Sequence, residues 1–399
     1  MPEAEPLVEV KNLYKIFGPH PDEAYRLLEE GYTKDEIFER TGMTVGVRDA
    51  NFSVYKGEVF VVMGLSGSGK STLIRMLNRL IEPTFGHVII DGQDVTQMDK
   101  KELIALRRQD MSMVFQSFAL MPHLSVWENA AFGLDVAGID KQERHDRAVA
   151  ALEQVGLKAN ADSYPDELSG GMQQRVGLAR ALAADPTLML MDEAFSALDP
   201  LIRTEMQDEL VRLQSEQART VVFISHDLDE AMRIGDRIAI MEGGRIVQVG
   251  TPDEILNQPA DDYVQSFFRG VDVSNIFTAG DIARKDQLTL VYHQAESVRS
   301  ALKQLHDYSR HWAYVRDKGN HLLGVVSVES LLELEREGGK HNIEEAYLDV
   351  EPVSPDTSLD DLLHITTQYT CPVPVVDEQG KYLGTVSKTT LLETLGKAA

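Results

Sequence analysis

The sequence predicts an α/β domain followed by a smaller α+β region, and two observations support this prediction. In the first part, apolar strand candidates alternate with helical stretches, which is typical of a mostly parallel sheet covered by helices. After about residue 270 the chain instead contains an internal repeat with an offset of 60 residues. The strand candidates of the first part are residues 7–10, 50–54, 58–63, 88–90, 113–115, 187–191 and 221–225.

Length and composition restrict the class of protein. With 399 residues the chain should hold two or three domains. No apolar run approaches the roughly 18 residues that span a bilayer, and the acidic start lacks a secretory signal pattern. The single cysteine, Cys371, allows no internal disulfide and is typical of a reducing cytosol. The formal net charge of −25 opposes nonspecific binding to nucleic acid or anionic lipid, so no nucleic-acid partner is expected.

Two features are added to the α/β core. Residues 18–46 form an insertion with helical spacing, and we expect two short helices on either side of Gly31. Residues 237–241 and 245–249 are joined by a glycine-containing turn and predict a β-hairpin. We expect this first domain to span residues 1–270.

The repeat that follows consists of two similar units. The segment 323–327, Leu-Gly-Val-Val-Ser, returns at 383–387 as Leu-Gly-Thr-Val-Ser. Each unit is expected to have the order helix, strand, strand, helix. Two stacked units could bury an apolar face that neither buries alone. We expect the two domains to span residues 271–338 and 339–399.

A phosphate-binding loop follows the strand ending at Met63 and opens a helix expected at 71–80. Backbone N–H groups of such a loop cradle phosphates, and the helix N-terminus adds the positive end of its dipole. Lys70 would reach the β and γ phosphates, and the Ser71 hydroxyl would ligate Mg²⁺. The expected nucleotide-binding residues of the loop are Gly64, Ser66, Gly67, Ser68, Gly69, Lys70, Ser71 and Thr72.

Two carboxylates follow the strand at 187–191. Asp192 can hold Mg²⁺ through water, while Glu193 can polarise a water that attacks the γ-phosphate. An acidic cap at the end of a strand is a simpler interpretation for either residue alone. The choice between these interpretations depends on the motifs that surround the pair.

The run 168–175, Leu-Ser-Gly-Gly-Met-Gln-Gln-Arg, lies between the phosphate loop and Asp192. It resembles the signature of ABC-type ATPases, and 194–199 resembles their D-loop with Asp199, which favours catalytic roles for the two carboxylates. Ser169 can cap the helix that follows. In that family the signature contacts the γ-phosphate bound by the other subunit. The resemblance implies a homodimer with two composite ATP sites, in which the signature residues are Ser169, Gly170, Gly171 and Gln173.

The same resemblance assigns roles to other polar residues at strand ends. Gln116 resembles the Q-loop ligand of Mg²⁺ and water, and His226 resembles the H-loop histidine that contacts the γ-phosphate. Without this context, a lone Gln usually lies at the surface and a lone His is more often structural. Phe17 is a candidate to stack on adenine, with Tyr14 as the competing aromatic residue. The resemblance implies ATP and Mg²⁺ as cofactors. The implied catalytic residues are Glu193, His226, Gln116 and Lys70. The implied Mg²⁺ ligands are Ser71, Gln116 and Asp192.

Apolar residues between Gln116 and Gly133 have two interpretations. Packing inside a helical subdomain accounts for most of them. The resemblance adds that some could line a groove for a coupling helix of a membrane partner, and Leu120 is the candidate to test. The residues are Phe118, Leu120, Met121, Pro122, Leu124 and Trp127.

The repeat after residue 270 resembles a tandem pair of CBS domains. Pairs that bind adenosine nucleotides usually carry an Asp three residues after the Ser or Thr of the repeated turn. Ser330 and Thr390 occupy these positions here, which weakens the expectation of ordinary nucleotide sensing without excluding a nucleotide held differently. Sensing of ionic strength at a membrane surface, through a patch of basic residues, is the alternative to nucleotide sensing. A solvated face without a sensing role is the simpler interpretation of these basic residues. The candidate lipid-facing residues are Lys303, Arg310, His311, Arg316 and Lys318.

Over essentially its whole length the chain resembles the ATPase subunits of glycine betaine/proline betaine importers. The features that carry the resemblance are the ABC core, the insertion after Phe17 and the C-terminal CBS pair. The family implies two copies of this subunit on two membrane permease subunits, with an external binding protein that captures the solute. It also implies a peripheral position on the cytoplasmic face of the membrane.

Other functions remain open at this stage. A motor for a different small solute, such as an amino acid or an opine, is disfavoured by the CBS pair and the insertion. A soluble ABC ATPase of DNA repair or translation is disfavoured because the chain lacks a long coiled coil or a second ATPase domain, and because of its acidic charge. The CBS pair could also be a dimerisation module without a sensing role.

Overall fold

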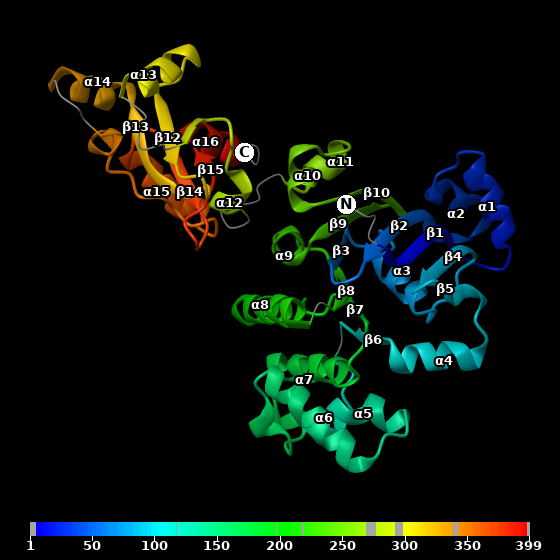
Figure 1. Ribbon diagram of the computed structural model, residues 1–399. Helices are drawn as coiled ribbons and strands as arrows, with labels where there is room; N and C mark the ends of the chain where they lie inside the picture. The colour runs from blue at the N-terminus through cyan, green and yellow to red at the C-terminus, as the bar shows by residue number, and fades with distance from the viewer. Residues whose placement is uncertain are drawn as a thin grey trace. The chain divides into compact units, whose positions relative to one another are not determined.

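The computed structural model describes residues 5–116, 118–196, 198–217, 219–268, 277–291, 298–337 and 342–396. The chain divides into two compact units, Met1–Phe267 and Phe268–Ala399. In Figure 1 the first unit is coloured from blue to green and the second mainly from yellow to red. The domain boundaries expected after residues 270 and 338 lie outside the described residues.

A six-stranded sheet forms the centre of the first unit, in the order β10-β9-β3-β8-β7-β6. All neighbouring pairs are parallel except the hairpin of β9 and β10, so the predicted mostly parallel core and the predicted hairpin are both confirmed. The carboxyl ends of β3, β7 and β8 meet at one edge, where a ligand site is expected in such folds. The strands are β3 (Val59–Met63), β6 (Met111–Val114), β7 (Leu188–Asp192), β8 (Thr220–Ser225), β9 (Arg237–Glu242) and β10 (Arg245–Gly250).

A second, antiparallel sheet has the order β2-β1-β4-β5. Its first strand is longer than the predicted 7–10. Asn12 adopts φ 46° and shifts the register against β2, but the pairing resumes after this irregularity and continues to Phe17. A short polar residue such as Asn tolerates this left-handed conformation. The strands are β1 (Pro6–Phe17), β2 (Thr44–Tyr55), β4 (Phe85–Ile90) and β5 (Gln93–Asp94).

The insertion between β1 and β2 folds into two short helices, α1 (Pro21–Glu29) and α2 (Lys34–Thr41), on either side of Gly31 as predicted. Pro21 begins α1, and Thr33 caps α2 in a reciprocal capping box with Glu36. The helices share one small core, whose buried residues are Ile16, Ala24, Ile37, Met43 and Val45.

The remaining helices of the first unit cover the sheet and build a separate helical subdomain from α5, α6 and α7 (Figure 1). The helix predicted at 71–80 ends earlier, at Leu77, because Arg79 has φ 56° and cannot continue an α-helix. The helices are α3 (Lys70–Leu77), α4 (Lys100–Gln109), α5 (Val126–Val136), α6 (Lys141–Gln154), α7 (Gly170–Ala183), α8 (Pro200–Gln217), α9 (Leu228–Ile234), α10 (Pro252–Asn257) and α11 (Asp262–Ser266), with 3₁₀ turns at Val95–Gln97, Lys158–Asn160 and Pro165–Glu167.

The second unit contains the predicted order helix, strand, strand, helix twice. The first copy is α13 (Val298–Asp307), β12 (Trp312–Arg316), β13 (Leu322–Ser327) and α14 (Val328–Glu337). The second copy is α15 (Leu359–Gln368), β14 (Val373–Val376), β15 (Tyr382–Val386) and α16 (Lys388–Gly396). The other elements are α12 (Ala279–Ile282), β11 (Leu288–Val291), which pairs with β12, and a 3₁₀ turn at Ile343–Ala346.

The two copies bury a shared face, as the sequence predicted. Tyr314 of β12 stacks on Tyr382 of β15 with 5.7 Å between ring centroids, and its hydroxyl donates to the carbonyl oxygen of Pro372 at 2.5 Å. Burial raises the pKa of both tyrosines well above the usual value. Cys371 is buried in the same cluster. This packing holds the repeat together through aromatic contact area that neither copy could bury alone.

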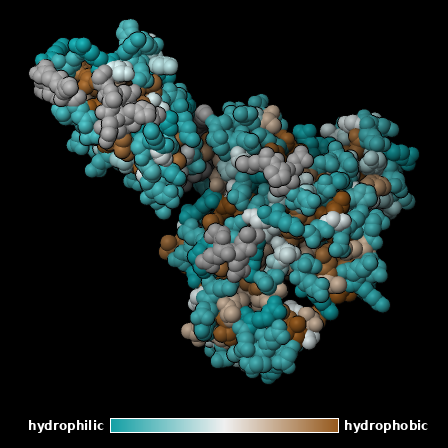
Figure 2. Space-filling view, in the orientation of Figure 1, coloured by the Kyte–Doolittle hydropathy of each residue, from teal (hydrophilic) through white to brown (hydrophobic). Residues whose placement is uncertain are grey.

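The surface is mainly hydrophilic in the view of Figure 2, with apolar residues scattered among charged ones. In the described part of the chain, none of the helices has the length and hydrophobicity of a membrane-spanning segment.

Candidate functional site

The phosphate-binding loop connects β3 to α3 through positions that require glycine. Gly69, immediately before α3, has φ 105°, and a Cβ atom there would lie 2.3 Å from the carbonyl oxygen of Gly46. At Gly64 a Cβ atom would lie 2.2 Å from the carbonyl oxygen of Met241. Any side chain would clash at both positions, so the loop can fold tightly over the start of the helix only with glycine.

Lys70 is buried beneath this loop. Its Nζ atom donates hydrogen bonds to the carbonyl oxygens of Gly64 at 2.7 Å and Leu65 at 3.0 Å. Burial lowers the pKa of Lys70, while the negative charges of Glu193 and Asp192 oppose this shift. An ammonium group held only by neutral carbonyls gains energy when phosphate oxygens replace them, because charge-assisted hydrogen bonds are stronger.

A buried network joins α3 to the end of β7. The Ser71 hydroxyl donates to Oδ1 of Asp192 at 2.8 Å, and Arg75 donates to Oδ2 from Nη2 at 2.9 Å and from Nε at 3.2 Å. The Asp192 carboxylate is almost fully buried, so it needs such partners. The sequence analysis missed Arg75. Its position four residues after Ser71, which places both on one helix face, could have indicated it.

Glu193 directly follows this network and has a strained backbone. Its φ of 47° lies in the left-handed region, where residues other than glycine are uncommon and often functional. The Oε2 atom accepts a hydrogen bond from Nε2 of Gln116 at 3.0 Å and lies 3.7 Å from Nδ1 of His226. Two candidate residues from two other strand ends, Gln116 and His226, therefore face one carboxylate oxygen of Glu193.

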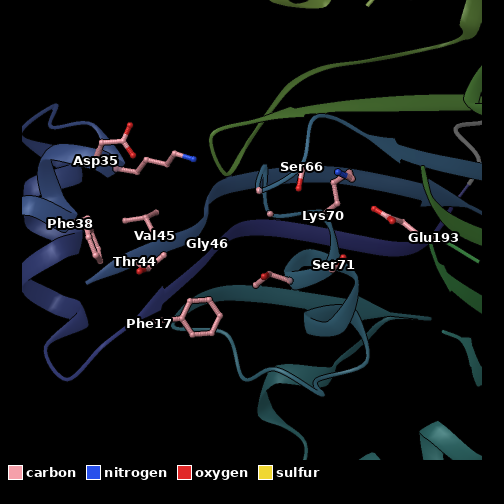
Figure 3. A pocket seen from close by; sticks show the side chains of 14 residues that line it. Phe17, Asp35, Phe38, Thr44, Val45, Gly46, Ser66, Lys70, Ser71 and Glu193 are labelled. Carbon is pink, nitrogen blue, oxygen red and sulfur yellow. The ribbon is translucent and has the colours of Figure 1, made fainter. Parts of the chain in front are cut away.

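A pocket of about 470 Å³ extends from Glu193 across the phosphate loop to the insertion (Figure 3). Phe17 lines it from the end of β1 and is 40% exposed. Tyr14 does not line it, because its ring packs against Tyr25 and Phe85. The lining residues are Phe17, Lys34, Asp35, Phe38, Thr44, Val45, Gly46, Ser66, Gly67, Gly69, Lys70, Ser71, Thr72 and Glu193.

The insertion contributes residues to this pocket that the sequence analysis missed. Phe38 of α2 is 56% exposed, and Figure 3 shows its ring on the side of the pocket where Phe17 lies, with Lys70 and Glu193 toward the other end. Two exposed rings on one side of a polar pocket suit a planar heterocycle. Two predicted loop residues do not line the pocket. The carbonyl oxygen of Gly64 accepts a hydrogen bond from Lys70, and Ser68 is buried.

Comparison with known proteins gives matches over the whole chain. A family model described as ABC transporter matches residues 47–196, and a CBS domain model matches residues 347–397. The glycine betaine/proline betaine transport system ATP-binding protein of Salmonella typhimurium is 58% identical over 98% of each chain. The chain belongs to this family of ABC transporter ATP-binding subunits.

Other relatives agree with this assignment. The glycine betaine transport ATP-binding protein of Bacillus subtilis is 47% identical over 97% of this chain and 92% of its own. Among solved structures, a dimeric ATP-binding cassette in a post-hydrolysis state with ADP and phosphate has a TM-score of 0.52 and 32% identity, covering 61% of this chain and 98% of that one. As a member of this family the chain is an ABC-type ATPase that binds ATP.

In this ATP-binding subunit the signature lies apart from the nucleotide pocket. Ser169 caps α7 as predicted, since its side chain accepts from the backbone N–H of Met172 at 3.3 Å. Ser169 and Gly170 are exposed, and Gln173 donates to the carbonyl oxygen of Pro165 at 2.8 Å. Asp199 is also exposed and accepts from the N–H of Ile202 at the start of α8. The start of α7 is thus open to an anion held by another molecule.

The apolar segment after Gln116 is attached to the signature helix of the subunit. Arg180 of α7 donates to the carbonyl oxygens of Ala119 at 2.8 Å and Phe118 at 3.3 Å, and burial lowers the pKa of Arg180. Leu120 is half-buried, so it is less open to solvent than a groove residue was expected to be. These contacts support the packing interpretation, and the partner groove stays a prediction.

In the CBS pair of the subunit, Ser330 and Thr390, which stand where the resemblance implies a nucleotide-binding Asp, lie in the first turns of capped helices. Ser327 and Ser330 exchange hydrogen bonds between side chain and backbone at 2.9 and 3.0 Å. Ser387 accepts from the N–H of Thr390 at 3.0 Å, and Thr390 is buried. These hydroxyls stabilise the starts of α14 and α16.

The basic residues considered for lipid contact are separated by a strand. Arg310 and His311 precede β12, whereas Lys318 follows it and Arg316 ends it. A strand of this length spans about 16 Å, which exceeds the Debye length of ~8 Å at physiological salt. The candidate residues on either side of β12 therefore form two groups along the chain, and lipid contact by either group stays a prediction.

Proposed function

We propose that this chain is the ATP-hydrolysing subunit of an importer for glycine betaine, proline betaine and similar osmoprotectants. The observation that carries the proposal is the 58% identity, over 98% of both chains, to a glycine betaine/proline betaine transport ATP-binding protein. The site geometry supports it, because Lys70, Glu193 and two exposed aromatic rings line one pocket.

The candidate site residues have distinct proposed roles in ATP hydrolysis. The phosphate loop and Lys70 hold the β and γ phosphates, and Phe17 stacks on adenine with Phe38 beside it. The carboxylate of Glu193 accepts a proton from the attacking water, and its strained backbone fixes the direction of the side chain. His226 and the amide of Gln116 orient that water and the γ-phosphate around the same carboxylate.

The residues around Asp192 fit Mg²⁺. The Ser71 hydroxyl, the Asp192 carboxylate and the Gln116 amide oxygen would supply hard oxygen donors, which this ion prefers. When bound, Mg²⁺ would neutralise charge on the phosphates. Arg75 would then be free to leave Asp192, since the carboxylate would gain a second cation.

We also propose that the subunit acts as a homodimer. The signature residues Ser169, Gly170, Gly171 and Gln173, of which the first two are exposed, would contact the γ-phosphate bound by a second copy, and Asp199 would lie at the same interface. Two permease subunits and an external binding protein would complete the importer, with this chain on the cytoplasmic face of the membrane.

The C-terminal repeat is proposed to gate the importer. We assign residues 1–270 to the ATPase domain and 271–338 and 339–399 to two CBS domains. Since Ser330 and Thr390 carry hydroxyls in place of the usual Asp and donate their backbone N–H groups to Ser327 and Ser387, a nucleotide would have to bind elsewhere on the pair. Ionic strength sensed at the membrane surface is the other candidate signal.

Reconstitution with the permease and binding protein in liposomes tests this function. ATP hydrolysis should depend on external glycine betaine and rise with internal salt, and deletion of residues 277–399 should abolish the salt response. Hydrolysis that ignores glycine betaine would refute the proposed solute class. Glu193→Gln should retain ATP, trap a dimer and lower turnover by about 100-fold or more; full activity of this variant would refute its role as the base.

A further inference from the structure

A second pocket, of about 430 Å³, lies beside the insertion in the same unit. No residue that lines it also lines the nucleotide pocket. It is formed by β1, α1, β2 and β10, and its lining residues are Tyr14, Tyr25, Leu28, Glu29, Arg48, Asp49, Arg245 and Ile246.

Two tyrosine rings form one wall of this second pocket. The rings of Tyr14 and Tyr25 meet edge to face with centroids 5.1 Å apart, and Phe85 supports both from the strand behind. Burial and then the charge of Asp49 raise the pKa of Tyr14 to about 12, and the charge of Glu29 is the largest cause that raises the pKa of Tyr25. Aromatic rings under a negative potential attract cations, quaternary ammonium groups above all.

The charged groups of the second pocket do not neutralise one another. Among the described residues, Glu29 and Asp49 form no ion pair, and Arg48 forms neither an ion pair nor a side-chain hydrogen bond, with its Nε atom buried. The other charged lining residue, Arg245, pairs with Glu242 at 3.6 Å, outside the lining. Asp49 is fixed by the amides of Asn12 at 3.2 Å and Asn51 at 2.9 Å. Charges of both signs around one pocket are complementary to a ligand that carries both charges itself.

We propose that the second pocket binds a compact zwitterion whose ammonium group is methylated, with Tyr14, Tyr25, Glu29 and Asp49 around the ammonium and Arg48 on the carboxylate. This is the chemical class of the solute in the proposed function, on which the choice of ligand rests. The ATPase subunit would thereby bind the solute that the importer accumulates.

The second pocket is connected to the nucleotide pocket through shared elements. On β1, Tyr14 lines the second pocket and Phe17 lines the first, three residues or ~10 Å apart along the strand. Helix α1 lines the second pocket and α2 the first, and both pack on the same small core. A ligand that orders α1 is therefore expected to change the KM for ATP.

Equilibrium dialysis of labelled glycine betaine against the purified full chain, without permease or binding protein, tests this proposal. Glu29→Gln and Arg48→Met should each weaken binding about tenfold or more, because each removes a charged partner. Glu30→Gln, at the exposed neighbouring position, is the matched control and should bind like wild type. Choline, which lacks the carboxylate, and glycine, which lacks the methyl groups, should bind more weakly than glycine betaine.

Three outcomes would overturn the proposal: no saturable binding by the wild type, equal binding by all variants, or choline binding as tightly as glycine betaine. Thermal unfolding of each variant verifies that it is folded. The ATPase assay adds an independent measurement, since glycine betaine should shift the KM for ATP in the wild type and not in Arg48→Met. Transport of glycine betaine into liposomes that contain no glycine betaine tests the proposed function separately. If transport fails, the dialysis experiment still decides whether the second pocket binds the zwitterion.

Discussion

Removing Arg75 should destabilise the subunit when Mg²⁺ and ATP are absent. The Asp192 side chain is 3% exposed and that of Arg75 is 43% exposed. Breaking a fully buried pair costs about 3–5 kcal/mol, whereas an exposed pair contributes about 0–1 kcal/mol. Arg75 lies between these cases, and Ser71 still donates to the other carboxylate oxygen, so Arg75→Met should lower the free energy of unfolding by about 2 kcal/mol. Methionine keeps the apolar stem, so the loss reports the charge.

Thermal unfolding in EDTA measures this effect. For a unit of this size, 2 kcal/mol corresponds to a fall in Tm of roughly 4–6 °C. Lys56→Met is the matched control, because the pair of Lys56 with Asp91 is exposed on both sides and its loss should shift Tm by less than about 2 °C. Added Mg²⁺ and ATP should narrow the difference between Arg75→Met and wild type. Equal shifts for the two variants in EDTA would refute the argument.

Three further predictions concern residues outside the phosphate loop. Phe38→Ala should raise the KM for ATP about fivefold with kcat nearly unchanged, since it removes one partly exposed stacking surface; an unchanged KM would remove Phe38 from the adenine site. Arg180→Gln should lower the stimulation of ATPase by the permease several-fold while ATPase of the isolated subunit persists, and undiminished stimulation would separate Arg180 from coupling. Burial raises the pKa of Glu230 above 4.5, so its contribution to stability is present below pH 4.5 and is lost as pH rises through the raised pKa. Glu230→Gln should therefore flatten the dependence of Tm on pH above 4.5, and parallel curves for variant and wild type would contradict this assignment.

Local patterns accounted for the parts of the site that depend on short stretches of chain. The order strand, glycine loop, helix predicted the geometry around Lys70, and Ser169 capped its helix as expected. In contrast, the contact of Arg75 with Asp192 joins residues more than one hundred positions apart, so the helical spacing from Ser71 indicates the face on which Arg75 lies but not its partner. Phe38 reaches the pocket because an insertion folds back over β1, which helical spacing alone does not indicate.

Spacing along the chain does not give spacing in the fold where a strand intervenes. The basic residues between Lys303 and Lys318 are neighbours along the chain, yet β12 separates them because an extended segment moves about 3.3 Å per residue. The early end predicted for β1 has a related cause. Continued pairing with β2 past the irregular Asn12 depends on the partner strand, which no property of the residues after Val10 reveals.

The shared core under α1 and α2 has a thermodynamic consequence for the cell. A core of a few buried side chains transmits a shift of one helix to the other, because close packing leaves little slack. Linkage then acts in both directions: a solute that weakened ATP binding tenfold would itself be bound tenfold more weakly in the presence of ATP. The internal solute concentration at which uptake slows would then rise with the ATP concentration. A cell with abundant ATP would therefore accumulate more solute than a starved cell.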